Sequence, residues 1–312
     1  MRAFALDTFG EPGSVRDLPT PEPTEGQVRV RVAAASINPV DHAVIKGFLK
    51  DYMEHHFPLV PCGDLAGSVD AVGPGVEGIS VGDPVVGSVG KMVMGEGTLA
   101  EFATASAGTI AGRPSALGEV EAAALPLAGV SALMSLEAAD PQPNEVVVVV
   151  GASGGIGGYA VQLAAACGAH VVAVTSTSNV EYVRGLGAAE VLDRLAGDVV
   201  DALRSGHPEG VSAIIDTPSD QPTLARLSEA VRDGGTVTSM KGAAPQELQD
   251  RRVRGVNIRT QVTTERLEEL LDMIAEGKLR APHIRTFTLD RAGDALEASG
   301  QGGVQGKLVV TV

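Results

Sequence analysis

The sequence predicts an α/β protein with two domains, a mostly β domain and a doubly wound parallel-sheet domain. Residues 1 to about 118 carry short β-type runs separated by Gly and Pro turns. From about residue 119, helical patterns alternate with short apolar strands, the order expected of a parallel sheet. The chain has 312 residues, and roughly 150 residues per domain makes two domains the default.

The mostly β domain is predicted over residues 1–118, together with the closing stretch 279–312. Its Gly- and Val-rich sequence alternates extended runs with turns such as Gly73-Pro74-Gly75. The extended runs are expected at residues 27–33, 66–72 and 83–89, and at 308–312 at the end of the chain.

The parallel-sheet domain is predicted over residues 119–278. Five consecutive valines, Val146 to Val150, suit a central strand whose two faces are both buried. A helix is expected after it at 155–167, and an amphipathic helix at 264–277. The other expected elements are strands at 170–175, 213–216, 236–239 and 257–261 and a helix at 179–186.

The charge balance excludes several kinds of partner. The chain carries 24 basic and 39 acidic residues, a net charge of −15, which repels nucleic acid phosphates and anionic lipid. No uncharged apolar run reaches the roughly 20 residues that span a bilayer. The first ten residues read as an alternating strand rather than a signal peptide, so a cytoplasmic location is expected.

The most specific local signal is a glycine-rich turn between the valine strand and the helix expected after it. The run 151–157 fits the G-x-G-x-x-G template, with Ala152, Gly154 and Gly157 at the template positions. Small residues let the backbone approach a pyrophosphate, and the helix N-terminus offers free N–H groups to its phosphates. A turn without a ligand is the alternative, which the flanking strand and helix disfavour. The predicted Rossmann dinucleotide site contains Ala152, Ser153, Gly154, Gly155, Ile156 and Gly157.

The end of the second strand indicates which dinucleotide to expect. NAD sites place Asp or Glu about 20 residues after the glycines, to bind the ribose 2′-OH. Here the strand ends in hydroxyl and amide side chains, Thr175, Ser176 and Asn179, with no carboxylate among them to repel a 2′-phosphate. Arg184 or Arg194 could supply a positive charge, although either could equally be a solvated surface side chain. We therefore predict NADPH as the cofactor and assign Arg194 to its site.

Several motifs, taken in order along the chain, match one family. They are Ser36-Ile-Asn38-Pro-Val-Asp41, residues 58–67, Leu125-Pro-Leu-Ala-Gly-Val-Ser131, the glycine turn, residues 186–193 and Gly306-Lys-Leu-Val-Val310. Together they resemble the zinc-independent, zeta-crystallin-like quinone oxidoreductases of the medium-chain dehydrogenase/reductase superfamily. The resemblance implies a GroES-like catalytic domain beside the Rossmann domain. It also implies that Ser131 lies close to the nicotinamide-side phosphate and that Ser239 borders the cofactor.

The same resemblance addresses zinc. Zinc alcohol dehydrogenases of this superfamily carry a Cys in the first motif and Gly-His-Glu in the second, where this chain has Asn38 and Gly63-Asp64-Leu65. The only cysteines are Cys62, which is not at a ligand position, and Cys167, so the four-cysteine structural lobe is absent. Without imidazole and thiolate ligands we expect no metal.

The reaction implied is hydride transfer from NADPH to a quinone or an α,β-unsaturated carbonyl (enone or enoyl) substrate. The family places Asn38 and Asp41 in the cleft near the nicotinamide, where the Asn38 amide could bond the substrate carbonyl or the cofactor ribose. Asp41 could instead hold its own loop. Tyr52, in the variable substrate-side segment 51–57, is the preferred proton donor, and His55 and His56 are alternatives. Water is a further alternative, because Ala43 stands where the family has a tyrosine.

Two further alternatives remain, and one prediction concerns assembly. A non-catalytic dinucleotide-binding protein is the runner-up function, and a zinc-type alcohol dehydrogenase is the least favoured.

The strand expected at 257–261 ends the sheet and carries no proline, so its bare edge predicts a homodimer with a continuous sheet. Solvation of Arg259 at that edge would instead keep the chain monomeric.

Overall fold

The computed structural model describes residues 1–90, 93–244 and 253–312, and these fold into two compact units. The first unit comprises Met1–Ala128, Val262–Ala275 and His283–Val312, and the second comprises Gly129–Gln261 and Glu276–Pro282. The division falls within helix α3 (Pro126–Ala139). Among the described residues, no helix is both long and apolar enough to cross a membrane.

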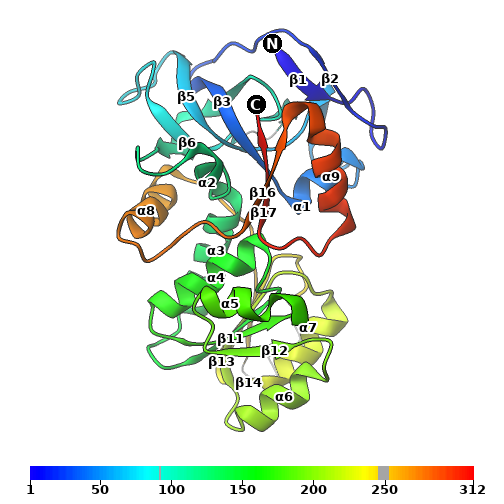
Figure 1. Ribbon diagram of the computed structural model, residues 1–312, viewed down its shortest axis with the longest axis vertical. Coiled ribbons are helices and arrows are strands. Elements are labelled where there is room, and N and C mark those ends of the chain that lie inside the picture. Colours follow the sequence, from blue (N-terminus) through cyan, green and yellow to red (C-terminus); the bar gives the residue numbers. More distant parts are fainter. Residues whose placement is uncertain (91–92, 245–252) are drawn as a thin grey trace. The chain divides into compact units, whose positions relative to one another are not determined.

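The first unit is built on a mostly antiparallel sheet (Figure 1). Its strands run in the order β16 (Ile284–Thr288), β17 (Lys307–Thr311), β3 (Gln27–Ile37), β5 (Asp64–Val72), β6 (Pro84–Ser88) and β9 (Ile110–Gly112), with β8 (Phe102–Ser106) also paired to β3. Small ribbons join β1 (Arg2–Ala5) to β2 (Ser14–Asp17) and β4 (Glu54–Val60) to β7 (Val93–Glu96). The helices are α1 (Pro39–Ile45), α2 (Glu119–Ala123), α8 (Thr264–Ala275) and α9 (Ala292–Gln301).

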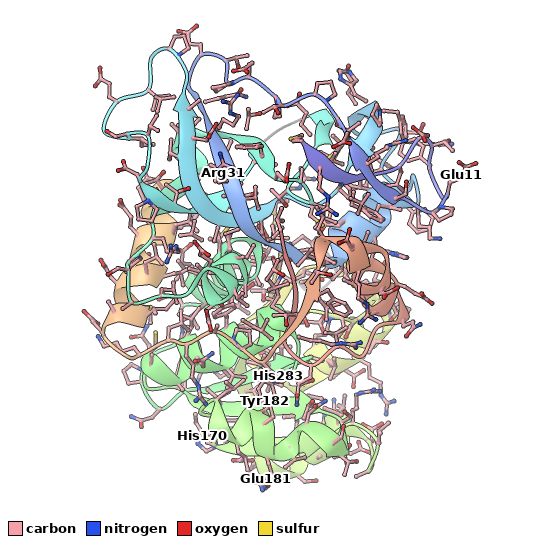
Figure 2. The ribbon with its side chains drawn as sticks, turned by 45° about the horizontal axis from the view of Figure 1, so that its top comes forward. Glu11, Arg31, His170, Glu181, Tyr182 and His283 are labelled. Atoms are coloured by element: carbon pink, nitrogen blue, oxygen red, sulfur yellow. The ribbon has the colours of Figure 1, made fainter. Side chains whose placement is uncertain are left out.

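Strand β3 shows how the sequence forms this sheet. Val28, Val30 and Val32 alternate with arginines and are buried in the core, as the period of two for a strand requires. On the opposite face the guanidinium of Arg31, a residue labelled in Figure 2, lies 4.5 Å from the centroid of the Phe102 ring. The strand runs on to Ile37 and so delivers Ser36 and the following Asn38 to one end of the core.

The second unit is a parallel sheet with strands in the order β12 (Glu190–Asp193), β11 (His170–Thr175), β10 (Val146–Val150), β13 (Val211–Asp216), β14 (Val231–Ser239) and β15 (Arg254–Asn257). The helices that the structure describes in this unit include the larger part of α3, α4 (Gly155–Ala166), α5 (Val180–Gly185), α6 (Val199–Gly206) and α7 (Gln221–Leu227). The valine strand β10 pairs with β11 and β13 and is buried, so the predicted central strand is confirmed.

Two edge strands were harder to predict. The terminal strand β15 covers Arg254–Asn257, so the predicted strand at 257–261 is wrong in its bounds although right in its place at the end of the sheet. Strand β12, at the other end of the sheet, is half-buried throughout. Its sequence is not a continuous apolar run like that of β10, so the sequence did not indicate a strand there. Central strands carry a strong sequence signal because both faces are covered, whereas edge strands do not.

The predicted domain bounds at 118/119 and 278/279 need correction. Helix α8 was expected in the parallel-sheet domain, but it belongs to the first unit. Its Thr264 hydroxyl donates to the Ile110 carbonyl at 2.8 Å, next to β9, and Leu267, Leu270 and Leu271 are buried. An amphipathic stripe shows that a helix packs on a core but does not show on which core.

Candidate functional site

The glycine turn follows the end of β10 in the second unit. Gly151 has a φ of +77°, and a Cβ there would lie 2.4 Å from the Thr217 hydroxyl oxygen. A Cβ on Gly157 would lie 2.2 Å from the Gly151 carbonyl oxygen, so both glycines are required by the turn itself. A Cβ on Gly154 would meet only the Gly151 oxygen, at 3.4 Å. Gly154 is therefore the glycine whose open side is available to a ligand.

Helix α4 begins directly at this turn, with Gly154 as its N-cap. Gly155, Ile156 and Gly157 form its first turn, whose N–H groups have no partner within the helix. No acidic side chain lies in that first turn to compete with an anion. The aligned N–H groups and the positive end of the helix dipole together suit a phosphate.

The polar residues predicted for the ribose side are brought together at the carboxyl ends of β10 and β11. The Asn179 amide donates to the Ser176 hydroxyl at 3.0 Å and to the Ser153 hydroxyl at 3.2 Å. The buried Thr175 hydroxyl has no hydrogen-bond partner in the part of the chain that the structure describes. Arg194 donates its backbone N–H to the Thr175 carbonyl at 2.8 Å, which places this exposed residue beside the end of β11. An orphan hydroxyl beside an open glycine turn fits a dinucleotide.

A carboxylate that the sequence reasoning missed lies at the same edge. Asp193 ends β12 and accepts hydrogen bonds from the Thr177 hydroxyl and from the Leu195 N–H, the latter at 2.9 Å. The Thr177 hydrogen bond is the main reason that the pKa of Asp193 is below its ordinary value. No carboxylate lies among residues 175–179, as predicted, but the neighbouring strand β12 brings one to the same edge of the sheet.

The two remaining predicted cofactor residues are buried and already paired. The Ser131 hydroxyl lies 2.6 Å from the Thr260 hydroxyl, and both belong to the second unit. The Ser239 hydroxyl, at the end of β14, accepts the N–H groups of Lys241 at 3.2 Å and Ala243 at 3.0 Å. Both serines hold local structure, and their roles toward a cofactor stay predictions.

In the first unit, a set of buried polar groups surrounds the start of α1, and we name it the polar cluster. Its members, all under 9% exposed, are Ser36, Asn38, Asp41, Cys62, Asp64 and Lys307. Asn38 precedes α1, and its backbone N–H donates to the Asp41 carboxylate at 2.7 Å. Asp41 therefore does hold the turn at the helix start, as one of the two predicted readings proposed.

Hydrogen bonds link the rest of the polar cluster through the Asn38 carboxamide. Its Nδ2 donates to Asp64 Oδ2 at 2.8 Å, and its Oδ1 accepts from Lys307 Nζ at 2.5 Å. Asp64 also accepts from the Ser36 hydroxyl at 3.0 Å. The sequence reasoning assigned no role to Asp64 or Lys307. The sequence does contain one signal for such a role, because Lys307 is the one charged residue at the start of the otherwise apolar strand β17.

Burial sets the electrostatics of the polar cluster. It raises the pKa of Asp41 to about 7, with the nearby Asp64 adding to the rise and the Asn38 N–H and Lys307 opposing it. Burial also raises the pKa of Asp64 and lowers the pKa of Lys307. The thiol of Cys62, hydrogen-bonded to Asp41, has a pKa well above its ordinary value, chiefly because it is buried. Asp41 is therefore able to hold or release a proton near neutral pH.

These donors do not fit a zinc ion. Zinc sites use thiolate, imidazole or carboxylate ligands, whereas here the Asn38 carbonyl faces the Lys307 ammonium and the Cys62 thiol stays protonated. Within residues 1–90, 93–244 and 253–312, no group of three or more His, Cys, Asp or Glu side chains is arranged to hold a metal ion.

A cavity of the first unit opens onto the polar cluster. Asn38, Asp41, Cys62 and Asp64 line it, and its apolar wall is Val40, Val44, Leu59, Val60, Val89, Met94 and Leu127. The predicted proton donor Tyr52 does not line this cavity and is 84% exposed.

The two histidine alternatives do not line the cavity either. His55 packs edge-on against the Phe9 ring, with 5.0 Å between the ring centroids, and His56 pairs with Glu54 at 2.7 Å. The structure therefore brings Asn38 and Asp41 together and leaves Tyr52, His55 and His56 apart from them.

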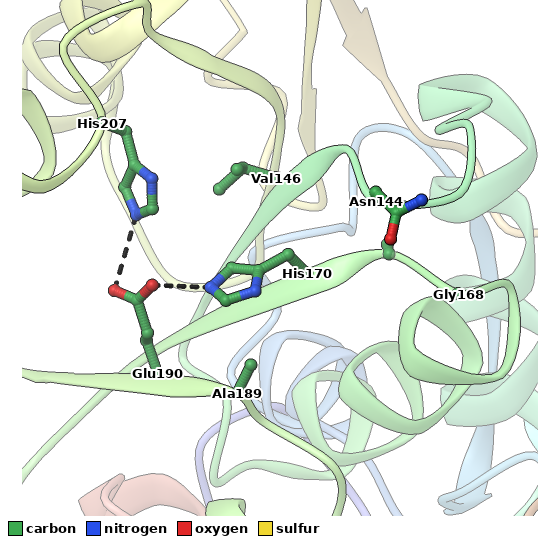
Figure 3. Close-up of a pocket in the computed structure, with 8 residues that line it drawn as sticks. Asn144, Val146, Gly168, His170, Ala189, Glu190 and His207 are labelled. Atoms are coloured by element: carbon green, nitrogen blue, oxygen red, sulfur yellow. Dashed lines mark hydrogen bonds and ion pairs between the residues drawn. The ribbon is translucent and has the colours of Figure 1, made fainter.

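A second hollow lies in the second unit, at the starts of β10, β11 and β12 (Figure 3). In it, Glu190 lies 2.6 Å from His170 Nε2 and 3.5 Å from His207 Nε2. Because parallel strands begin at one edge and end at the other, this hollow is on the edge opposite to the glycine turn. It is not part of the dinucleotide site.

Comparison with known proteins agrees with this geometry. Residues 24–115 match the alcohol dehydrogenase GroES-like domain, and residues 186–310 match the zinc-binding dehydrogenase family. The chain is similar to a chloroplast envelope quinone oxidoreductase homolog of Arabidopsis thaliana, with 33% identity over 94% of this chain and 92% of that protein. It is 30% identical to a 2-methylene-furan-3-one reductase of Solanum lycopersicum, over 99% of this chain and 79% of that protein.

Solved structures agree with the predicted fold class. The structure of a quinone oxidoreductase from Coxiella burnetii superposes with a TM-score of 0.89 at 29% identity, and covers 100% of this chain and 99% of that one. The matches confirm the GroES-like and parallel-sheet architecture that the sequence motifs predicted.

Proposed function

The chain belongs to the quinone oxidoreductase family of the medium-chain dehydrogenase/reductase superfamily, and from that premise we propose that it is an NADPH-dependent reductase of quinones or enones. The observation that carries the proposal is a glycine turn whose open side at Gly154 has room for a pyrophosphate, in a chain whose zinc-motif positions hold Asn38 and Asp64. A reaction without a metal-bound alkoxide suits a carbon–carbon double bond activated by a carbonyl, or a quinone ring. The name of the tomato relative describes such an enone.

The second unit supplies the groups that would hold the cofactor. The backbone at Gly154 and the first turn of α4 would bind the pyrophosphate, and Ser176, Asn179 and Arg194 would meet the ribose 2′-phosphate. Bound NADPH supplies the hydride. Asp193 works against a 2′-phosphate, but its oxygens are occupied by Thr177 and Leu195 and its charge is opposed by Arg194. That balance favours NADPH over NADH.

The polar cluster supplies the groups for the substrate oxygen. Adding a hydride to an enone or quinone carbon moves an electron pair onto the carbonyl oxygen, and a positioned N–H donor stabilises that charge. Asn38 offers such an N–H. Asp41, whose pKa of about 7 lets it exchange a proton near neutral pH, would return a proton to the oxygen.

A steady-state assay tests the proposal. We expect the purified protein to oxidise NADPH in the presence of 1,4-benzoquinone or members of an enone panel, and NADH more slowly. Full activity after chelation, with no metal found by elemental analysis, is expected as well. NADPH binding without turnover of any of these compounds would instead favour a non-catalytic dinucleotide-binding protein. Activity that depends on zinc and oxidises alcohols would refute the proposal.

We also propose a homodimer that forms along β15. In the described part of the second unit, β15 is the terminal strand of the sheet. The Ile258 N–H donates inward to the Ser239 carbonyl at 2.9 Å, so the N–H groups of Asn257 and Gly255 point away from β14. Those outward groups are the ones that a second chain would bind.

A further inference from the structure

Lys307 reaches the polar cluster through a backbone path that only glycine permits. Gly306 has a φ of +70°, and a Cβ there would lie 1.8 Å from the carbonyl oxygen of His283, a residue labelled in Figure 2. The chain then enters β17, where Leu308 pairs with Ile37 of β3. This register brings Lys307 to the end of β3, next to Asn38, although the two residues are 269 positions apart in sequence.

The contacts of Lys307 fix which way the Asn38 carboxamide points. The Lys307 ammonium has only donors, and it donates to the Ile37 carbonyl at 3.2 Å and to Asn38 Oδ1 at 2.5 Å. An ionised Asp64 has only acceptors, so the atom facing it must be Nδ2. Turning the amide over would place an NH₂ group against the ammonium and an oxygen against the carboxylate. Both contacts would then be repulsive in a buried site.

We propose that Lys307 is a positioning residue that, together with Asp64, locks the Asn38 carboxamide so that one Nδ2–H is left for the substrate oxygen. Nδ2 carries two hydrogens, and the one bond that the structure shows for it goes to Asp64. Asn38 lines the cavity and Lys307 does not, so the lysine acts through the amide. The choice of a carbonyl oxygen as the partner rests on the proposed function.

A purely structural role makes a different prediction. If Lys307 only compensates the charge of the buried Asp64, then removing both charges together should remove the need for the lysine. If Lys307 sets the orientation of the Asn38 amide, the protein still needs the lysine after the substitution Asp64→Asn. The uncharged carboxamide that this substitution introduces can both donate and accept, and so permits either orientation of Asn38.

Enzyme kinetics separate the two roles. The variants are Lys307→Met, Asp64→Asn and the double variant, and Lys278→Met is the control because Lys278 is exposed and paired with Glu276 at the surface. We expect Lys307→Met to lower kcat by at least about 10-fold, both in the wild-type and in the Asp64→Asn background, with KM for NADPH changed by less than about 2-fold. An Asp64→Asn background in which Lys307→Met has no effect on kcat would overturn the positioning role. NADPH titration of each variant checks that the second unit is folded.

A second measurement does not depend on activity. The Asn38 side-chain NH₂ pair is identified in an ¹⁵N–¹H spectrum by its absence from Asn38→Asp. We expect the pair to shift and its hydrogen exchange to accelerate in Lys307→Met/Asp64→Asn, more than in Asp64→Asn alone. If these spectral changes occur but the protein reduces no quinone or enone, the proposed function is refuted, while the orienting role of Lys307 toward the Asn38 carboxamide stands. Signals in the double variant identical to those of Asp64→Asn would refute the lock.

Discussion

Replacing Asp41 by Asn tests the electrostatics of the polar cluster directly. Asn has nearly the same shape, keeps an oxygen to accept the Asn38 N–H, and cannot ionise. In the folded protein the carboxyl of Asp41 faces Asp64, Lys307 and the Cys62 thiol, and its pKa is about 7 instead of the ordinary 3.8. The unfolded chain therefore loses this proton at a lower pH than the folded protein does.

The sign and size of the effect follow from proton linkage. Between the two pKa values the folded state binds more protons, so the stability of the wild type falls as pH rises, by about 1.4 kcal/mol per pH unit for this one group. From pH 5 to pH 7 the loss is about 2.3 kcal/mol, and it levels off at about 3 kcal/mol near pH 8, where the carboxyl is ionised in both states. Asp41→Asn lacks this loss.

Urea unfolding followed by circular dichroism measures how the free energy of unfolding changes with pH. We expect Asp41→Asn to gain about 3 kcal/mol in free energy of unfolding relative to wild type between pH 5 and pH 8. The exposed Asp272 on α8, changed to Asn, is the control and should show no such gain. A difference between Asp41→Asn and wild type that is the same at both pH values would refute a raised pKa for Asp41.

Three further predictions concern the cofactor site and assembly. Gly154→Val should weaken NADPH binding at least about 10-fold in fluorescence titration with the fold intact, and an unchanged Kd would contradict the phosphate site. Gly157→Ala should instead destabilise the turn itself, which thermal unfolding measures. Arg194→Ala should raise the Kd for NADPH more than the Kd for NADH, and an equal rise in both would exclude a 2′-phosphate contact. Arg184→Ala is the control and should change neither Kd, because Arg184 pairs with Glu181. Gly255→Pro should convert a dimer to a monomer in light scattering by removing an outward N–H, and a monomeric wild type would refute the dimer.

The local parts of the fold and of the candidate cofactor site were predictable from sequence. The valine strand, the glycine turn and α4 lie within one continuous stretch, and β10 and β11 have the predicted bounds. Their signals are local because a doubly buried strand must be apolar and a tight turn beside a helix N-terminus must be small. The same reasoning placed Ser153, Ser176 and Asn179 at one edge of the sheet.

The long-range parts were not predictable in the same way. Lys307 meets Asn38 only because β17 pairs with β3 in one register, and nothing near either residue specifies that pairing. Asp193 was missed because its strand was missed. The sequence favours a proton donor in the exposed segment around Tyr52, where several titratable side chains occur together, whereas the burial that raises the pKa of Asp41 depends on the assembled core. The predicted strand bounds would also have suggested Ile258→Pro as a test of the dimer, but that N–H is used within the sheet.

Cys62 has a consequence for the chemical durability of the protein. Enones and quinones alkylate cysteines, and the thiolate is the reactive form. The Cys62 thiol borders the same cavity as Asn38, yet burial and the neighbouring Asp41 keep it protonated. We therefore expect a quinone or enone in this cavity to alkylate Cys62 only slowly, because burial and the buried carboxyl group of Asp41 both disfavour the thiolate.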